Sequence, residues 1–198
     1  MTTSTKILLQ IDEKECRDIW TNIHDNMNNY QVQSSMWELI HRNYMCAYFA
    51  KLVFNNLGNC KLCGKLEQKR THIFLNCDVA KMVIRNFEYI LLPFHSEVLS
   101  VKEMTFGVLA KGKIENRIHN YILYTIRHTL FRSRNTDYHN INNAVSSITN
   151  KTNKIIRNYL KNKFYIAFSK NATHKFAQTY LYNNILGKIE GNAFETKL

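Results

Sequence analysis

Proline and glycine are scarce in this chain of 198 residues, which contains one proline and six glycines. Both residues favour turns, so their scarcity leaves little material for the many tight turns of a strand-rich sandwich or barrel. Apolar residues make up 45% of the chain, which suits one compact domain with a substantial core. We therefore predict a mainly α fold.

Long apolar runs are also missing. No segment approaches the run of about eighteen apolar residues that a membrane-spanning helix needs. The first residues, MTTSTKILLQIDEKEC, carry acids where a secretory signal would need a longer apolar core. We expect an intracellular protein, nuclear or cytoplasmic, that is not secreted and has no membrane partner.

The sequence lacks the motifs of several enzyme classes. It has no Y-x-D-D-like pair of carboxylates, and two-metal polymerisation needs at least two acids that converge on magnesium. It has no glycine-rich phosphate loop and no serine, histidine and aspartate in a supporting context. Four scattered histidines, His119, His128, His139 and His174, are typical of surface or packing positions. We therefore expect no enzymatic activity.

Acidic residues are scarce in the second half of the chain. Residues 1–100 hold 11 Lys and Arg against 10 Asp and Glu, whereas residues 101–198 hold 16 against 5. Nearly all of the net charge of +12 therefore lies in the second half. This asymmetry indicates a surface that binds a polyanion, although a lysine-rich chain that merely stays soluble is the plainer interpretation.

Helical periodicity recurs along most of the chain. The helical pattern is weak in the stretch SSITNKTNK, where one long helix can break. The last helix should reach Ile189, and the tail after Gly191 should fray. The second helix should end before Gly58 and the third at Pro93. The expected helices begin after Asp12 as N-cap, at a capping box of Ser35 and Glu38, after Asp78, at a capping box of Ser100 and Glu103, near Ile114, near Tyr138 and near Phe176.

Three of the five cysteines cluster with a histidine in the stretch CKLCGKLEQKRTHIFLNC. The spacing is C-x2-C-x8-H-x4-C, and a C-x2-C turn followed by Gly64 lets two thiolates meet one ion. Four such ligands with no spare position predict a closed, structural Zn²⁺ site, so the expected fold is a helical domain with an embedded CCHC zinc knuckle. The predicted ligands are Cys60, Cys63, His72 and Cys77.

The last two ligands restrict the backbone between them. Five positions of an α-helix rotate by about 500°, which leaves His72 and Cys77 about 140° apart. A straight helix cannot aim both side chains at one ion, so the segment must turn, with residues 73–75 anchoring the turn to the core. Two other interpretations are a redox-active cysteine pair and a catalytic zinc with Glu67 as its base.

The cluster and its flanks resemble the zinc-binding region at the carboxyl end of non-LTR retrotransposon reverse transcriptases. A weaker similarity continues to Asn135, and Lys61 replaces the proline that is common in that family. The resemblance implies a helical, zinc-bound domain that contacts RNA or DNA beside a polymerase. The matching positions are Trp37, Cys60, Cys63, Gly64, Glu67, His72, Phe74, Cys77, Ala80 and Phe87.

We predict a nucleic-acid-binding module without its own polymerase site, whose contacts with RNA or DNA are dominated by phosphates. Tyr121, Tyr124, Tyr159 and Tyr165 either stack on unpaired bases or belong to the core. The alternative is a zinc-stabilised protein-interaction or scaffolding domain, with a reverse transcriptase or another protein as partner. The candidate phosphate contacts are Lys61, Lys65, Lys69, Arg70, Arg117, Arg127, Arg132, Arg134, Lys151, Lys154, Arg157, Lys161 and Lys163.

The zinc motif divides the chain into three parts. Residues 1–58 should form N-terminal helices, residues 59–92 the zinc motif with the helix that follows it, and residues 93–198 a basic helical region. We expect the three parts to form one compact unit.

Overall fold

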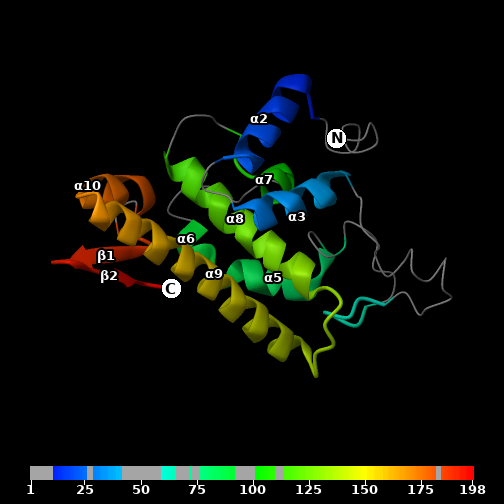
Figure 1. Ribbon diagram of the computed structural model, residues 1–198. Coiled ribbons are helices and arrows are strands. Elements are labelled where there is room, and N and C mark those ends of the chain that lie inside the picture. Colours follow the sequence, from blue (N-terminus) through cyan, green and yellow to red (C-terminus); the bar gives the residue numbers. More distant parts are fainter. Residues whose placement is uncertain are drawn as a thin grey trace.

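The computed structural model of the chain (Figure 1) describes residues 11–25, 29–41, 59–65, 72, 76–91, 101–109, 114–181 and 184–198. Over these residues the only sheet is a two-stranded hairpin, so the prediction of a mainly α fold is confirmed. The elements are α2 (Glu13–Ile23), α3 (Tyr30–His41), α5 (Asp78–Arg85), α6 (Glu88–Leu91), α7 (Val101–Phe106), α8 (Ile114–Ser133), α9 (Ile141–Ser169), α10 (Thr173–Phe176), the π-helical turn η3 (Ala177–Leu181), β1 (Gly187–Glu190) and β2 (Ala193–Thr196).

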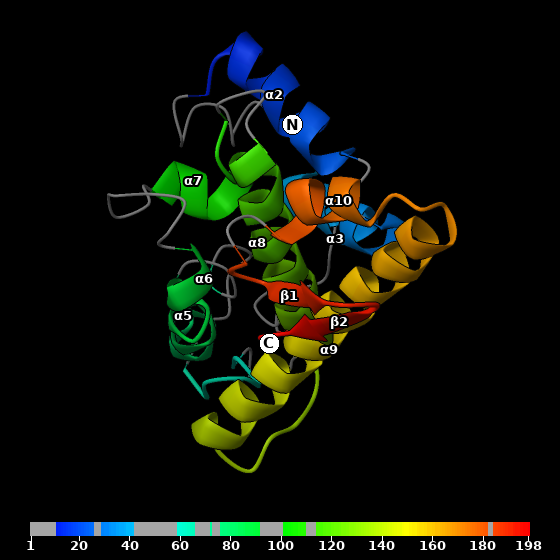
Figure 2. The same ribbon diagram turned by 90° about the vertical axis from the view of Figure 1, so that its left-hand side faces the viewer.

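Helix α8 runs through the middle of the molecule and is buried along almost its whole length. It contacts α2 and α3 on one side and α5 and α9 on the other, as the two views show (Figures 1 and 2). Its buried threonines are satisfied within the helix, because Thr125 and Thr129 each donate a hydrogen bond to the carbonyl four residues earlier. The central helix therefore accommodates polar side chains without leaving these hydroxyls unpaired.

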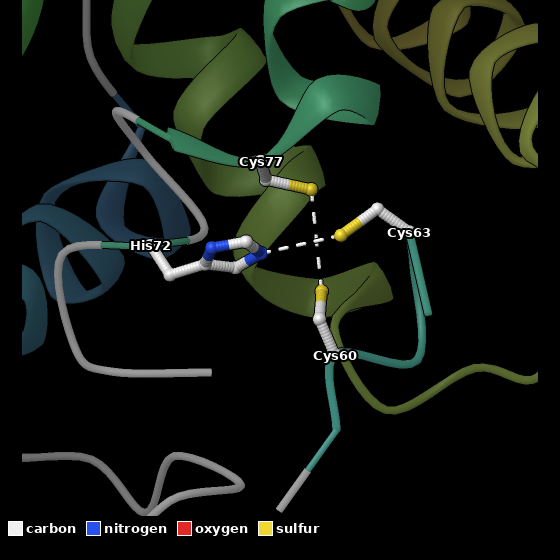
Figure 3. A group of neighbouring side chains, drawn as sticks. All are labelled: Cys60, Cys63, His72 and Cys77. Carbon is white, nitrogen blue, oxygen red and sulfur yellow. Dashed lines mark hydrogen bonds between the residues drawn. The ribbon is translucent and has the colours of Figure 1, made fainter. Parts of the chain in front are cut away.

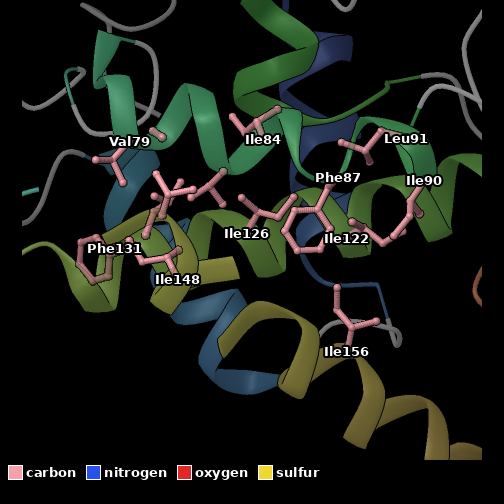
Figure 4. Close-up of a cluster of buried hydrophobic side chains, with 14 of the residues drawn as sticks. Val79, Ile84, Phe87, Ile90, Leu91, Ile122, Ile126, Phe131, Ile148 and Ile156 are labelled. Carbon is pink, nitrogen blue, oxygen red and sulfur yellow. The ribbon is translucent and has the colours of Figure 1, made fainter. Parts of the chain in front are cut away.

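The larger core lies between α5, α6, α8 and α9 (Figure 4). Val83 and Phe87 come from the α5–α6 segment, Ile122 and Ile126 from α8, and Ile156 from α9, and all five are almost completely buried. A second core joins α2, α3, α7 and α8. Each apolar side chain removed from water contributes about 1.5–3 kcal/mol to the free energy of folding. Since α8 contributes side chains to both cores, their burial holds it between the other helices.

The N-terminal helices begin where local capping groups allow. Asp12 is the N-cap of α2 as predicted, and it forms a capping box with Glu15. The prediction that Ser35 begins the next helix is wrong: α3 starts five residues earlier, because the Asn29 side chain accepts a hydrogen bond from the Val32 amide. Ser35 is instead buried inside α3, with its hydroxyl 2.8 Å from Nδ1 of His128.

The helix predicted after Asp78 is divided in two. Its N-cap is Cys77, one residue before the predicted cap. Helix α5 ends at Arg85, a turn at residues 86–87 follows, and α6 begins at Glu88. The Asn86 side chain donates a hydrogen bond to the Thr149 hydroxyl of α9, so the turn is tied to the neighbouring helix. Gly58, Pro93 and Ser100, where other boundaries were predicted, lie outside the described residues.

Helix α9 is continuous through the stretch where a break was predicted. Ile148, Thr152 and Ile156 on its inner face are fully buried, and the Thr152 hydroxyl bonds back to the Ile148 carbonyl. Packing against α5 and α8 therefore overrides the low helix propensity of SSITNKTNK. No helix in the described part of the chain, α9 included, combines the length and the apolar character that crossing a bilayer requires.

The C-terminal prediction of a helix to Ile189 and a frayed tail is wrong. Strands β1 and β2 pair antiparallel, with Ile189 opposite Phe194, across a turn in which Gly191 has a φ of +57°. Gly191 and the residue after it form the two-residue connection that such hairpins favour. Phe194 packs against Phe164 and Phe176, so the hairpin covers the end of α9.

Replacing Gly107 by alanine should destabilise the fold by about 3 kcal/mol. Gly107 follows α7 with a φ of +79°, and an added Cβ would lie 2.4 Å from Oδ1 of Asn120, which already accepts a hydrogen bond from the Val108 amide. The positive φ accounts for about 1–2 kcal/mol and the steric overlap for the remainder. Urea denaturation measures the loss.

Gly191→Ala is the matched control, because Gly191 also has a positive φ but its Cβ would have open space around it. It should cost about 1 kcal/mol. Equal losses in the two variants would show that the contact with Asn120 contributes nothing.

Candidate metal centre

Cys60 and Cys63 lie on a tight turn whose geometry requires glycine. The Gly64 amide donates to the Cys60 carbonyl over 2.7 Å, and the Cys60 amide donates to the Lys65 carbonyl over 2.9 Å. Gly64 has a φ of +72°, a conformation that favours glycine. The turn therefore folds back on itself and brings both thiols to the same side.

His72 and Cys77 are joined by a wider turn than an α-helix makes. The Cys77 amide donates a hydrogen bond to the His72 carbonyl over 2.7 Å, which is the i to i+5 pattern of a π-helical turn. A turn with more residues brings positions five apart closer to the same side than the 140° separation in an α-helix. The structure thus agrees with the expectation that this segment departs from a straight α-helix.

The four predicted ligands converge on one point (Figure 3). One ligand atom from each of Cys60, Cys63, His72 and Cys77 lies within 4.8 Å of all the others. The Cys60 and Cys77 sulfurs are 4.0 Å apart, and the Cys63 sulfur is 3.3 Å from Nε2 of His72. In a tetrahedral zinc site the corresponding separations are about 3.8 Å and about 3.6 Å. These four residues could therefore hold a metal ion.

Burial makes the thiols difficult to ionise without a cation. Cys60 and Cys77 are fully buried and His72 is almost so. The hydrogen bond between Cys77 and Cys60, followed by burial, raises the pKa of the Cys77 thiol far above its ordinary value, and burial raises the pKa of Cys63. A divalent cation reverses this preference, because it stabilises the thiolates. The site therefore holds either protons or a metal ion.

The donor set suits a structural role better than the two other interpretations. Cys60, Cys63 and Cys77 are free thiols, not members of a disulfide. Three thiols and one imidazole already supply the four positions of a tetrahedral ion, which leaves none for substrate or water. Glu67, the candidate base of a catalytic zinc, lies outside the described residues, as do residues 73–75.

The site is part of the main core. Cys60, Leu62 and Cys77 are buried in the same cluster as Val79 of α5 and Ile118 of α8. Since Cys77 is also the residue from which α5 begins, a bound ion would join the loop at residues 59–65 to the first turn of that helix.

The basic residues of the metal loop are paired with acids. Lys61 lies 3.0 Å from Asp137 in the loop before α9, and Lys65 lies 2.9 Å from Asp78 at the start of α5. This pairing raises the pKa of Lys65 and lowers that of Asp78. Both pairs are exposed and therefore weak, but they cancel part of the charge that was predicted to meet phosphate. Lys69 and Arg70 lie outside the described residues.

Of the four arginines in and after α8, the structure leaves Arg132 well exposed. The prediction that Arg127 contacts nucleic acid is wrong for this conformation, because its side chain is 1% exposed. Burial lowers the pKa of Arg127 to about 9. Arg117 forms a two-point ion pair with Asp25, and the Arg134 guanidinium lies 3.9 Å from the centre of the Phe131 ring.

Most of the candidate basic residues of α9 are exposed. Lys151, Lys154, Arg157 and Lys161 are exposed, and Lys163 is half-buried with its ammonium 5.2 Å from the Tyr159 ring. The Arg157 side chain also donates a hydrogen bond to the Leu198 carbonyl. The structure thus gathers five of the predicted phosphate contacts on one helix.

The candidate stacking tyrosines divide into core and surface residues. Tyr121 and Tyr124 are fully buried, so they belong to the core, and Tyr159 packs against the core. Tyr165 is 64% exposed. Phe168, which is 42% exposed on the same helix, was not among the predicted stacking residues. Phe168 lies seven residues after Lys161 and therefore on the same face of the helix, and this spacing could have identified it.

Comparisons with known proteins find no relative of this chain. No family model matches it, and no match is found among the curated proteins or the solved structures. The interpretation of the site therefore depends on its own residues.

Replacing Cys77 by serine should abolish stoichiometric metal binding and lower the midpoint of thermal unfolding. Metal ligation by such clusters contributes about 10 kcal/mol or more, which is comparable with the whole stability of a domain. Elemental analysis of purified, reduced protein should give one metal ion per chain for the unaltered sequence and none for Cys77→Ser. A chelator should reproduce the loss of stability.

Cys16→Ser is the control, because Cys16 is a buried free thiol in the second core and lies outside the metal cluster. It should retain the metal ion. A Cys77→Ser protein with one tightly bound ion per chain would remove Cys77 from the ligand set.

Proposed function

We propose that the protein is a zinc-stabilised module that binds RNA or DNA through phosphate contacts and has no polymerase site of its own. The observation that carries this proposal is the charge of the segment from Tyr138 to Ile189. It contains eight Lys and Arg residues and no Asp or Glu. A polyanion is the partner that such a surface attracts most strongly.

Zinc is the metal that the donor set favours. Thiolate and imidazole are the usual ligands of structural zinc, whereas magnesium and calcium prefer oxygen. Three free thiols at one site also suit a reducing compartment, which supports an intracellular location.

The phosphate-binding surface that we propose lies on α9. Lys151, Lys154 and Lys161 are exposed there, and in the part of the chain that the structure describes none of them forms an ion pair with a carboxylate. The metal loop is less suitable, because its Lys61 and Lys65 already meet Asp137 and Asp78. Unpaired lysines attract an anion without first losing another partner.

A relation to retroelement reverse transcriptases remains part of the proposal. It is supported by the C-x2-C-x8-H-x4-C spacing, by Gly64 directly after the second cysteine, and by a helix that begins at the last ligand. A module of this kind would contact template or target nucleic acid beside a separate polymerase.

Affinity for duplex DNA should fall steeply as salt increases. Each neutralised phosphate contributes about −0.9 to the slope of log affinity against log salt, so about six contacts give a slope near −5. The triple variant Lys151→Gln, Lys154→Gln and Lys161→Gln should make the slope shallower by about 2.7. Fluorescence anisotropy of a labelled duplex over a salt series measures both slopes.

A triple variant with neutralised basic residues outside α9, Lys14→Gln, Arg17→Gln and Lys81→Gln, has the same net charge and should retain most of the slope. The same loss of slope in both triple variants would mean that net charge, and not α9, causes the binding. Absence of binding even at low salt would contradict the proposed function.

A further inference from the structure

One face of α9 carries cations and aromatic rings in succession. Lys154, Arg157, Lys161, Tyr165 and Phe168 follow one another at i, i+3, i+7, i+11 and i+14, so they lie along the same side of the helix. We call these five residues the basic–aromatic stripe. At 1.5 Å per residue it is about 21 Å long, and Figure 2 shows α9 as a single straight element along one edge of the molecule.

The two aromatic rings of the stripe are exposed but held in place from below. Tyr165 is 64% exposed and Phe168 42% exposed. The neighbouring Phe164 is 2% exposed, and its ring centre lies 5.7 Å from that of Tyr165 and 5.9 Å from that of Phe168. Phe164 in turn packs against Phe176 of α10. The exposed rings therefore rest on a fixed aromatic core, which reduces the entropy lost when a ligand covers them.

The two lysines of the stripe have no acidic competitor nearby in the sequence or among the described contacts, whereas Arg157 already donates a hydrogen bond to the Leu198 oxygen. No Asp or Glu occurs between Tyr138 and Ile189. Among the described residues, no carboxylate side chain forms an ion pair with Lys154 or Lys161. The stripe is thus complementary to a ligand that offers negative charge and flat rings together.

We propose that the basic–aromatic stripe binds single-stranded nucleic acid, an inference that rests on the proposed function and adds the form of the ligand. Lys154, Arg157 and Lys161 contact successive phosphates, while Tyr165 and Phe168 stack on unpaired bases. A duplex cannot use the two rings in this way, because its bases already stack on one another within the helix. The stripe therefore distinguishes unpaired from paired strands.

An anionic membrane is the competing ligand for a basic surface with exposed aromatic rings. An interfacial helix needs a broad apolar face to insert among lipids. The apolar face of α9 is already buried against α5 and α8, and Ile166 is the large aliphatic side chain that remains exposed beside the two rings. The single strand fits this surface better.

The test compares a labelled dT oligonucleotide of about twelve residues with the same strand annealed to its dA complement. The unaltered protein should bind the single strand more tightly. Tyr165→Ala should weaken single-strand binding about tenfold, since one stacking contact contributes about that factor, and should leave duplex binding within about twofold. Tyr165→Phe should restore the affinity, because it keeps the ring.

Two controls separate stacking from other effects. Tyr89→Ala removes a ring of similar exposure, 57%, from α6 and should change neither affinity. Lys154→Gln with Lys161→Gln should weaken binding to both forms and reduce the single-strand salt slope by about 1.4, at −0.7 per phosphate. Circular dichroism checks that each variant is folded.

The outcomes separate this inference from the proposed function. Equal affinity for strand and duplex, with no effect of Tyr165→Ala, would overturn the inference and leave the proposed function standing. Binding to neither form at low salt would overturn both. Binding to phosphatidylserine vesicles that is lost in Tyr165→Ala, without binding to either form of DNA, would assign the stripe to a membrane surface instead.

Discussion

The fold around residues 59–65 and 76–91 depends on the meeting of three thiols and one imidazole within 4.8 Å. Such a group is unstable as a set of thiolates, because like charges this close repel one another and burial removes the water that would screen them. A bound cation would turn this repulsion into attraction and fix the turn at Cys60 relative to the start of α5. The described loop residues 59–65 contribute few apolar side chains to the core, among them Leu62, so a bound ion would supply the cross-link that packing alone does not.

The consequences of that cross-link extend to the surface that we propose to bind nucleic acid. Helix α5 begins at Cys77 and packs against both α8 and α9. Asn86 at its end is hydrogen-bonded to Thr149 of α9, and Lys61 of the metal loop meets Asp137 just before α9 begins. A bound ion would therefore support one side of α9 through α5, while the hairpin and α10 cover the C-terminal end. Because the helix is supported along its length, its outer face remains free for a ligand.

The sequence alone was sufficient where the signal is local, and insufficient where tertiary packing decides. The four metal ligands follow from spacing and donor chemistry, and the cap at Asp12 follows from an aspartate placed just before an amphipathic pattern. In contrast, α9 passes through a weak stretch because its inner face packs on two helices, which no local pattern records. Arg127 was expected at the surface because charged residues are usually exposed, but other elements surround α8 on nearly all sides. The hairpin was missed because Ile189 also suited a helical repeat.

The metal cluster and the charged helix support different parts of the functional argument. Cysteines and histidines spaced to bind one ion occur in many small loops that need a cross-link. The cluster by itself is therefore evidence for a stabilising metal site and not for nucleic-acid binding. The acid-free surface of α9 has no such structural explanation, since a solvated helix gains stability from ion pairs of both signs along its face. A 29-residue helix with five cations and no carboxylate gives up those pairs and repels itself. That cost is offset when a polyanion supplies the missing negative charge. The charge of α9 is therefore the main support for the proposed binding of nucleic acid.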